Sequence, residues 1–190
     1  ESGFKKTIAL NPNYADAYKA YASTLIYTGR KEEAMEQIDI ALKLDPLNPL
    51  IKVNYGLDLI YVNKYDKALI VLQEILRMNP SNQTAISNIP LAYHLLGKYK
   101  EGFESWKLYY NTSYKDFVHV FDKGFAMGGY TDALNLEADT LVAQSKTAYF
   151  LPTEIAILYA CAGNKKRALD MLESAYDVRD PNLVALRQPI

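Results

Sequence analysis

Cysteine, histidine and tryptophan are scarce in this sequence: its 190 residues include one Cys, two His and one Trp. A single thiol excludes a disulfide within the chain and is typical of a reducing compartment, so we expect a cytoplasmic location. The two histidines, His94 and His119, are too far apart to form a metal pair on one helical turn, and neither has a Cys or a second His nearby. We therefore expect no metal site and no other cofactor.

Strong charge of one sign and long apolar runs are also missing. Charged residues make up 23% of the chain with a formal net charge of −1, which leaves no polybasic face to neutralise a phosphate backbone. No apolar run approaches the length of about 18 residues that a membrane-spanning helix needs. These features argue against nucleic-acid binding and against a membrane span.

Residue groups with catalytic spacing are absent from the sequence as well. Acidic residues are scattered, and Cys161 has no adjacent base and is interpreted as a packing residue. Asp122 follows His119 by one helical turn, a spacing that we interpret as a solvated contact. The pair Gly128-Gly129 lacks the preceding strand of a phosphate-binding loop. We therefore expect that the chain is not an enzyme.

The sequence does contain an internal repeat. Residues of the same kind recur at a step of 34 residues in four independent columns. These columns are Pro12, Pro46 and Pro80; Gly29, Asn63 and Gly97; Ala34, Ala68 and Gly102; and Tyr65 and Tyr99. A period of this length is typical of a helix–turn–helix unit that stacks on copies of itself.

Hydrophobic spacing within one period predicts two helices. Apolar residues three or four apart form one stripe over residues 15–27 and a second stripe over residues 33–44, separated by Gly29-Arg30. Asp45-Pro46 is expected to end the second helix, because proline cannot continue the hydrogen-bond ladder. Since no single helix pair can bury its stripe alone, stability must come from packing between neighbouring pairs.

The spacing of aromatic, small, Gly, Ala and Pro residues resembles the tetratricopeptide repeat (TPR). The resemblance implies an all-α, right-handed superhelical solenoid of antiparallel helix pairs, expected as a single domain over residues 1–190. Within it we expect the second helix of a truncated repeat at 1–14, regular repeats at 15–48, 49–82 and 83–116, degenerate repeats at 117–147 and 149–178, and a C-terminal tail at 179–190.

Both ends of the sequence suggest a larger context. Residues 1–10 resemble a second helix without its first, so we expect that the chain is a fragment of a longer protein. The stretch Arg179-Asp-Pro-Asn-Leu resembles the C-terminal repeat regions of some bacterial signalling or regulatory proteins, which carry nucleotide-cyclase or winged-helix DNA-binding domains. The tail after Arg179 is an alternative occupant of the chain's own surface, with four apolar residues to cover the last helix. These residues are Leu183, Val184, Leu186 and Ile190.

The resemblance also implies where a partner binds, because TPR arrays hold peptides or partner segments on a concave wall formed by the first helix of each repeat. Transferring the wall positions to this sequence gives a candidate groove for a peptide or partner protein. Its residues are Lys19, Ile26, Tyr27, Leu50, Val53, Asn54, Leu57, Tyr61, Asn88, Leu91 and His94, with Ile60 and Leu95 continuing the apolar strip.

Several modes of use remain open for this groove. Lys19 and Asn54 match two positions of a carboxylate clamp, but Thr84 and Asn88 stand where the clamp has basic residues. We therefore favour binding of an apolar or amphipathic segment that is oriented by Asn54 and Asn88. The apolar residues could instead pack against the chain's own helices. The groove could also belong to a sensor that binds a small ligand or to a homodimerisation unit, either of which would control an attached cyclase or DNA-binding domain.

Pro90 falls inside a predicted first helix, in the column occupied by Ala22 and Gly56. A proline there removes a backbone hydrogen bond to Ile86 and costs about 3 kcal/mol. We therefore predict a kink over residues 86–90.

Overall fold

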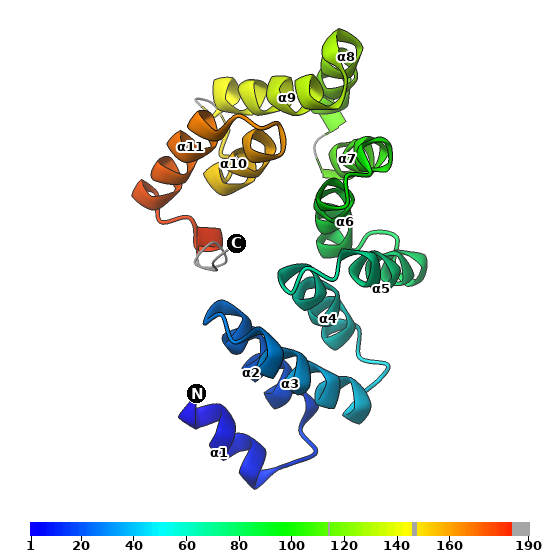
Figure 1. Cartoon of the computed structure of the whole chain (residues 1–190), viewed down its shortest axis with the longest axis vertical. Coiled ribbons are helices and arrows are strands. Elements are labelled where there is room, and N and C mark those ends of the chain that lie inside the picture. Colours follow the sequence, from blue (N-terminus) through cyan, green and yellow to red (C-terminus); the bar gives the residue numbers. More distant parts are fainter. Residues whose placement is uncertain (114, 146–147, 184–190) are drawn as a thin grey trace. The chain divides into compact units, whose positions relative to one another are not determined.

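The computed structural model describes residues 1–113, 115–145 and 148–183, and this part of the chain contains eleven α-helices, short 3-10 segments at 115–117 and 181–183, and no strand (Figure 1). The predicted all-α class is confirmed. The helices are α1 (Ser2–Leu10), α2 (Ala15–Tyr27), α3 (Lys31–Leu44), α4 (Pro49–Tyr61), α5 (Tyr65–Met78), α6 (Gln83–Leu95), α7 (Tyr99–Ser113), η1 (Lys115–Phe117), α8 (Val118–Gly128), α9 (Tyr130–Gln144), α10 (Pro152–Cys161) and α11 (Lys165–Asp177).

The helix boundaries follow the repeat. The first predicted helix, 15–27, is α2, and α3 ends at Leu44, directly before Asp45-Pro46. The shortened repeat forms α8 and α9 with Gly129 as the only residue between them. The proposed covering residues Val184, Leu186 and Ile190 lie outside the described residues. No helix in the described ranges combines the length and apolar character needed to cross a bilayer.

The turn inside each regular hairpin explains the Gly/Asn column. Gly29, Asn63, Gly97 and Gly163 all have φ between 62° and 79°, a left-handed conformation that favours glycine and tolerates asparagine. The next backbone N–H then donates to a carbonyl five residues earlier, as Arg30 does at 2.9 Å to the carbonyl oxygen of Leu25. This bond closes the C-terminus of each first helix and reverses the chain.

The chain divides into two compact units. Unit 1 comprises Glu1–Lys98 with α1 to α6, and unit 2 begins at Tyr99 and contains α7 to α11. The boundary falls inside the predicted repeat 83–116, between its two helices. The single domain expected from the repeat therefore stays a prediction.

Unit 1 has a core of aliphatic residues and tyrosines. Ile38 and Leu72, which occupy the same repeat position on α3 and α5, are fully buried, as are Ala34 and Ala68 four residues before them. Gly56 on α4 allows a close approach to α5, because a Cβ there would lie 2.9 Å from Cδ2 of Leu72. The two helices of a hairpin bury their apolar stripes against each other in this way.

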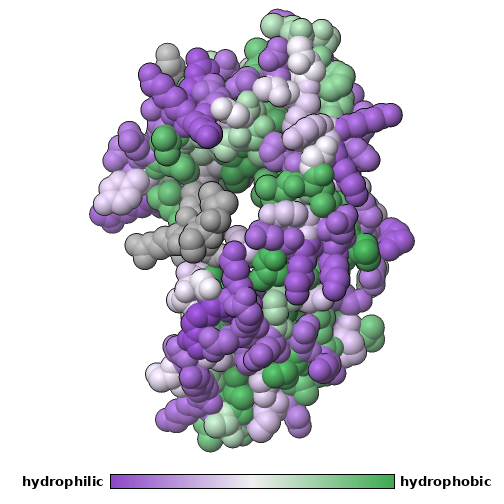
Figure 2. All heavy atoms as spheres, in the orientation of Figure 1, coloured by the Kyte–Doolittle hydropathy of each residue, from purple (hydrophilic) through white to green (hydrophobic). Residues whose placement is uncertain are grey.

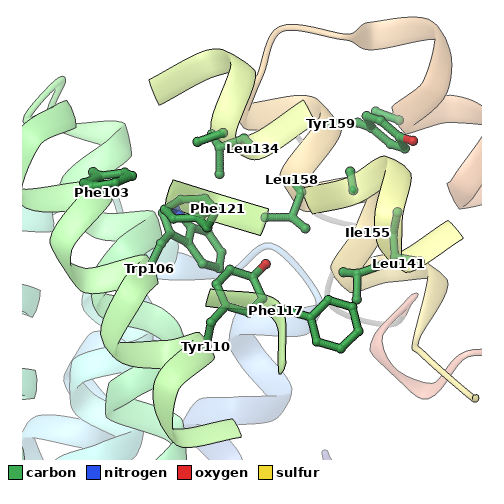
Figure 3. Close-up of a cluster of buried hydrophobic side chains, with 13 residues drawn as sticks. Phe103, Trp106, Tyr110, Phe117, Phe121, Leu134, Leu141, Ile155, Leu158 and Tyr159 are labelled. Atoms are coloured by element: carbon green, nitrogen blue, oxygen red, sulfur yellow. The ribbon is translucent and has the colours of Figure 1, made fainter. Parts of the chain in front are cut away.

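Unit 2 has a core dominated by aromatic rings (Figure 3). The ring of Phe121 lies 5.1 Å from that of Phe103 and 5.6 Å from that of Tyr110, measured between centroids. The indole N–H of Trp106 donates to the hydroxyl of Tyr130 at 3.2 Å. Ring pairs at these separations add specific contacts to the area that they bury.

Two glycines shape the shortened hairpin of unit 2. A Cβ at Gly124 would lie 2.6 Å from Cα of Ala133 and 2.8 Å from the carbonyl oxygen of Asp132, so α8 and α9 touch backbone to backbone there. Gly129 adopts φ 82° and ψ −154°, a combination that is essentially restricted to glycine. These two residues permit a hairpin without a longer loop.

Helix α6 continues across Pro90, which is buried, from Gln83 to Leu95. The expected kink over residues 86–90 stays a prediction.

Candidate interaction surface

The predicted groove residues come from α2, α4 and α6, the first helices of three successive hairpins, and all of them lie in unit 1. Helix α4 contacts α2 on one side and α6 on the other. Asparagine caps fix where two of these helices begin: the side chain of Asn48 accepts from the N–H of Leu50 at 3.0 Å, and that of Asn82 from the N–H of Ala85 at 2.9 Å. We call the side of unit 1 formed by α2, α4 and α6 the first-helix surface.

Large apolar side chains are exposed on this surface. Leu50 is 63% exposed, Leu95 44% and Tyr27 43%. Leu57, Tyr61 and Leu91 are half-buried beside them. Figure 2 shows hydrophobic residues emerging between hydrophilic ones over the helices of unit 1.

Three residues of the predicted strip do not reach the surface. Ile26 is 1% exposed, Ile60 8% and Val53 9%, and each belongs to a buried cluster of unit 1. These three side chains pack against the chain's own helices. For them the alternative raised from the sequence, internal packing in place of partner binding, applies. The exposed part of the predicted strip is correspondingly narrower.

The polar residues of the surface are engaged locally. The ammonium of Lys19 donates to the carboxylate of Asp16 at 2.7 Å, and the side-chain amide of Asn88 donates to the carbonyl oxygen of Thr84 at 2.8 Å. Asn54 is half-buried. Burial lowers the pKa of His94, so its imidazole is neutral near pH 7. A carboxylate clamp is disfavoured here, because the ammonium of Lys19 already pairs with the carboxylate of Asp16.

Asp58 on α4 is a polar residue that sequence reasoning missed. It is 4% exposed, and its Oδ2 atom has no hydrogen-bond partner among the described residues. Burial raises the pKa of its carboxyl from 3.8 to about 7. The signal in the sequence is one acidic residue between Leu57 and Leu59 in an otherwise apolar helix end.

Tyr61 and Tyr27 accompany Asp58. The pKa of Tyr61 is raised first by burial and then by the nearby Tyr27 and Asp58. Tyr61 lies one helical turn after Asp58 on α4, and Tyr27 is the last residue of α2. Tyr61 therefore interacts both with the carboxyl of Asp58 on its own helix and with the phenol of Tyr27 on α2.

The candidate catalytic and metal groups remain apart. Asp122 forms an ion pair with Lys107 at 2.7 Å, whereas His119 is exposed. Burial raises the pKa of the Cys161 thiol to about 12, which makes a thiolate nucleophile unfavourable. Within the described ranges no three His, Cys, Asp or Glu side chains are grouped to hold a metal ion.

The Arg179-Asp-Pro-Asn-Leu stretch has a structural role in unit 2. Asp180 is 3% exposed, and its Oδ2 accepts from the backbone N–H of Thr153 at 3.0 Å and from its hydroxyl at 2.7 Å. Its Oδ1 accepts from the N–H of Asn182 at 2.9 Å. The carboxylate thus caps the N-terminus of α10, which begins at Pro152.

Comparison with known proteins supports the fold. No protein-family model and no curated protein matches the sequence. Among solved structures, a tetratricopeptide repeat protein from Parabacteroides merdae is similar at 19% identity and a TM-score of 0.62, over 93% of this chain and 71% of that one. MamA from Desulfovibrio magneticus is similar at 15% identity and a TM-score of 0.55, over 93% and 81%. YrrB, described as a TPR protein with an unusual peptide-binding site, is similar at 18% identity and a TM-score of 0.50, over 96% and 78%.

Proposed function

We propose that this chain, which has the all-α TPR solenoid fold, is a non-catalytic protein-interaction module. Its first-helix surface in unit 1 would bind an amphipathic segment of a peptide or partner protein. The observation that carries this proposal is the exposure of Leu50, Tyr27 and Leu95 on helices whose other apolar residues are buried or half-buried. Exposed apolar patches on soluble domains commonly mark interaction sites.

The fold similarity is consistent with this use. YrrB is described as binding a peptide, and it shares the fold with this chain at low sequence identity. The side chains of Leu57, Leu91 and Tyr61 on the same helices are half-buried and add apolar contact area to the exposed residues. An amphipathic helix or an extended segment places apolar side chains at intervals that suit such a surface, with Asn54 available to orient its backbone.

The wider setting belongs to the same proposal. We propose a cytoplasmic fragment of a larger bacterial signalling or regulatory protein, in which this region recruits a partner. A second candidate function is a region that senses a small ligand or homodimerises to control an attached nucleotide-cyclase or DNA-binding domain. The capping role of Asp180 accounts for part of the Arg179-Asp-Pro-Asn-Leu stretch without any output domain.

Selection from a displayed library of random dodecamer peptides tests the proposal directly. Peptides selected on the whole chain should bind Leu50→Asp at least about thirtyfold more weakly, as expected when a main apolar contact is replaced by a charge. Ile70→Asp is a matched control, because Ile70 is 62% exposed on the second helix α5, against 63% for Leu50 on α4. It should leave the affinity within about twofold.

Light scattering separates partner recognition from self-association. A monomer that loses peptide binding in Leu57→Asp and Tyr61→Asp supports recognition of a partner. A wild-type dimer that these two substitutions dissociate points to self-association. Selected peptides that bind Leu50→Asp and Ile70→Asp equally well would contradict the proposed surface.

A further inference from the structure

Asp58 is a buried carboxyl that the fold does not require. Asp58 stands two residues after Gly56, the small residue of its first helix. The equivalent residues in three other repeats are Thr24, Ala92 and Leu158. An acidic side chain buried there without a full set of partners destabilises the folded chain, because its charged form is desolvated. A polar residue kept in such a place is a candidate for contact with a ligand.

Four other acidic side chains of unit 1 are arranged differently. Asp16, Glu33, Asp66 and Glu74 each form an ion pair with a Lys or Arg, and each is substantially exposed. Asp58 forms no ion pair within the described part of the chain, and burial alone accounts for its raised pKa. Tyr61 on α4 interacts with Asp58 and with Tyr27 of α2, and neither tyrosine supplies positive charge.

The two tyrosines complete a cation-binding group. Phenol rings attract ammonium and guanidinium ions through their negative faces. Tyr27, which is 43% exposed at the end of α2, interacts with Tyr61, and Tyr61 in turn interacts with Asp58. The long aliphatic stem of Lys or Arg can pass over apolar side chains such as Leu57 while its charged head reaches a carboxylate.

We propose that the segment bound by the first-helix surface carries a Lys or Arg side chain that pairs with Asp58 between Tyr27 and Tyr61. This inference rests on the proposed function and specifies the chemistry of the partner. The basic head group supplies the charge and the hydrogen-bond donor that the Oδ2 atom lacks. Apolar side chains of the same segment contact Leu50 and Leu91.

Binding of a cation has a pH signature. A positive partner favours the ionised form of Asp58, so formation of the complex releases a proton wherever the free carboxyl is protonated. With a free pKa of about 7, the affinity should be about tenfold weaker at pH 6 than at pH 8. Burial lowers the pKa of His94 on the same surface, so any protonation of its imidazole is shifted toward the acidic end of this range.

The test uses the dodecamer peptides whose binding to the whole chain depends on Leu50. The inference expects one Lys or Arg shared by these peptides. Replacing that residue with norleucine should weaken binding about thirtyfold or more to the wild-type chain. On Asp58→Asn the same replacement should have little effect, and the tenfold pH dependence should disappear. Asp39→Asn, which changes an exposed carboxyl on α3, is the matched control and should behave as wild type.

The outcomes distinguish the two proposals. Peptides that need Leu50 but contain no shared basic residue, or that bind norleucine variants equally well, overturn the inference and leave the proposed function standing. A norleucine effect that persists in full on Asp58→Asn also overturns the inference, because the cation then binds elsewhere. Failure to select any peptide that depends on Leu50 overturns the proposed function and the inference with it. Circular dichroism of Asp58→Asn verifies that the variant is folded.

Discussion

Unit 1 and unit 2 each bury one carboxyl without a full set of partners, but in different surroundings. Asp58 in unit 1 is 4% exposed and interacts with the half-buried Tyr61, which also interacts with the exposed Tyr27. Glu137 in unit 2 is 0% exposed, and neither carboxyl oxygen has a hydrogen-bond partner in the described ranges. Asp58 is thus one helical turn from a partly exposed side chain, whereas Glu137 is one helical turn from the fully buried Ala133 and Leu134.

The position of Glu137 makes the contrast sharper. It follows Ala133 by four residues, as Ile38 follows Ala34 in the first repeat. The same position is occupied by apolar or aromatic side chains in the other repeats, namely Leu72, Trp106 and Leu172. Similar helical hairpins therefore tolerate a carboxyl at two unlike places, and burial alone does not show whether the carboxyl serves binding or only weakens the core.

The largest expected effect comes from Glu137. Burial raises the pKa of this carboxyl from 4.5 to about 8, so the folded chain keeps a proton that the unfolded chain loses above pH 4.5. The free energy of unfolding of unit 2 should therefore fall by about 5 kcal/mol between pH 4.5 and pH 8 and then level off. Glu137→Gln should remove this pH dependence.

Urea unfolding followed by tryptophan fluorescence measures the effect, because the only tryptophan, Trp106, belongs to the core of unit 2. Glu173→Gln on α11 is the control, since that side chain is exposed. A wild-type stability that matches Glu137→Gln at both pH values would contradict a protonated buried carboxyl. Coincidence of the fluorescence and circular-dichroism transitions would also show whether the two units unfold together.

Helix caps give the next comparison. Unit 2 caps α10 with Asp180, 27 residues along the chain from Thr153, and unit 1 caps α4 with the adjacent Asn48. Asp180→Ala should lower the free energy of unfolding by about 2 to 3 kcal/mol, because the buried N–H and hydroxyl of Thr153 would lose their acceptor. Asn48→Ala should cost about 1 kcal/mol. Urea unfolding measures both, by fluorescence for unit 2 and by circular dichroism for the chain.

Asn48→Ser is the control for the local cap, because serine keeps an acceptor for the N–H groups of the first turn. Equal losses in Asn48→Ala and Asn48→Ser would show that the cap contributes little. A loss in Asp180→Ala no larger than in Asn48→Ala would contradict the long-range cap.

The last comparison, which includes the smallest expected effect, is between two helix glycines. Gly124→Ala should destabilise unit 2 by about 1 to 2 kcal/mol, because its Cβ would meet the backbone of α9, which cannot move aside easily. Gly56→Ala should change the stability by less than about 1 kcal/mol. Its Cβ meets a methyl group of Leu72 that can rotate, and alanine favours the helix. Thermal unfolding compares the two, and equal effects would contradict the difference in packing.

Much of the fold could be predicted from the sequence, because the repeat columns carry direct conformational meaning. Pro46 and the left-handed column at Gly29 and Asn63 fix helix ends, and the first predicted helix agrees with α2 to the residue. The division at Lys98 and Tyr99 could not be predicted, since the repeat continues across it. Contacts between hairpins decide that boundary, and they leave no periodic signal.

The candidate site was less predictable. The wall positions implied by the repeat include both the exposed Leu50 and the buried Ile26. Consecutive residues on a helix point about 100° apart, so wall positions at the edge of the buried apolar stripe can turn toward the core. Asp58 was missed because a single carboxyl has no partner residue at a diagnostic spacing. Its environment becomes visible only when α2 and α4 are packed together.

The single-residue link at Gly129 has a consequence for how such a hairpin could arise. Its backbone conformation suits only glycine, and the hairpin also needs Gly124 where α8 meets α9. The two glycines serve one geometry, because a single-residue link brings the facing ends of α8 and α9 close together, and Gly124 leaves room for the backbone of α9 there. Homologous chains whose repeat has the 31-residue step should therefore keep both glycines, and those with the regular 34-residue step should lack both. The two glycines and the shorter repeat should be gained or lost together.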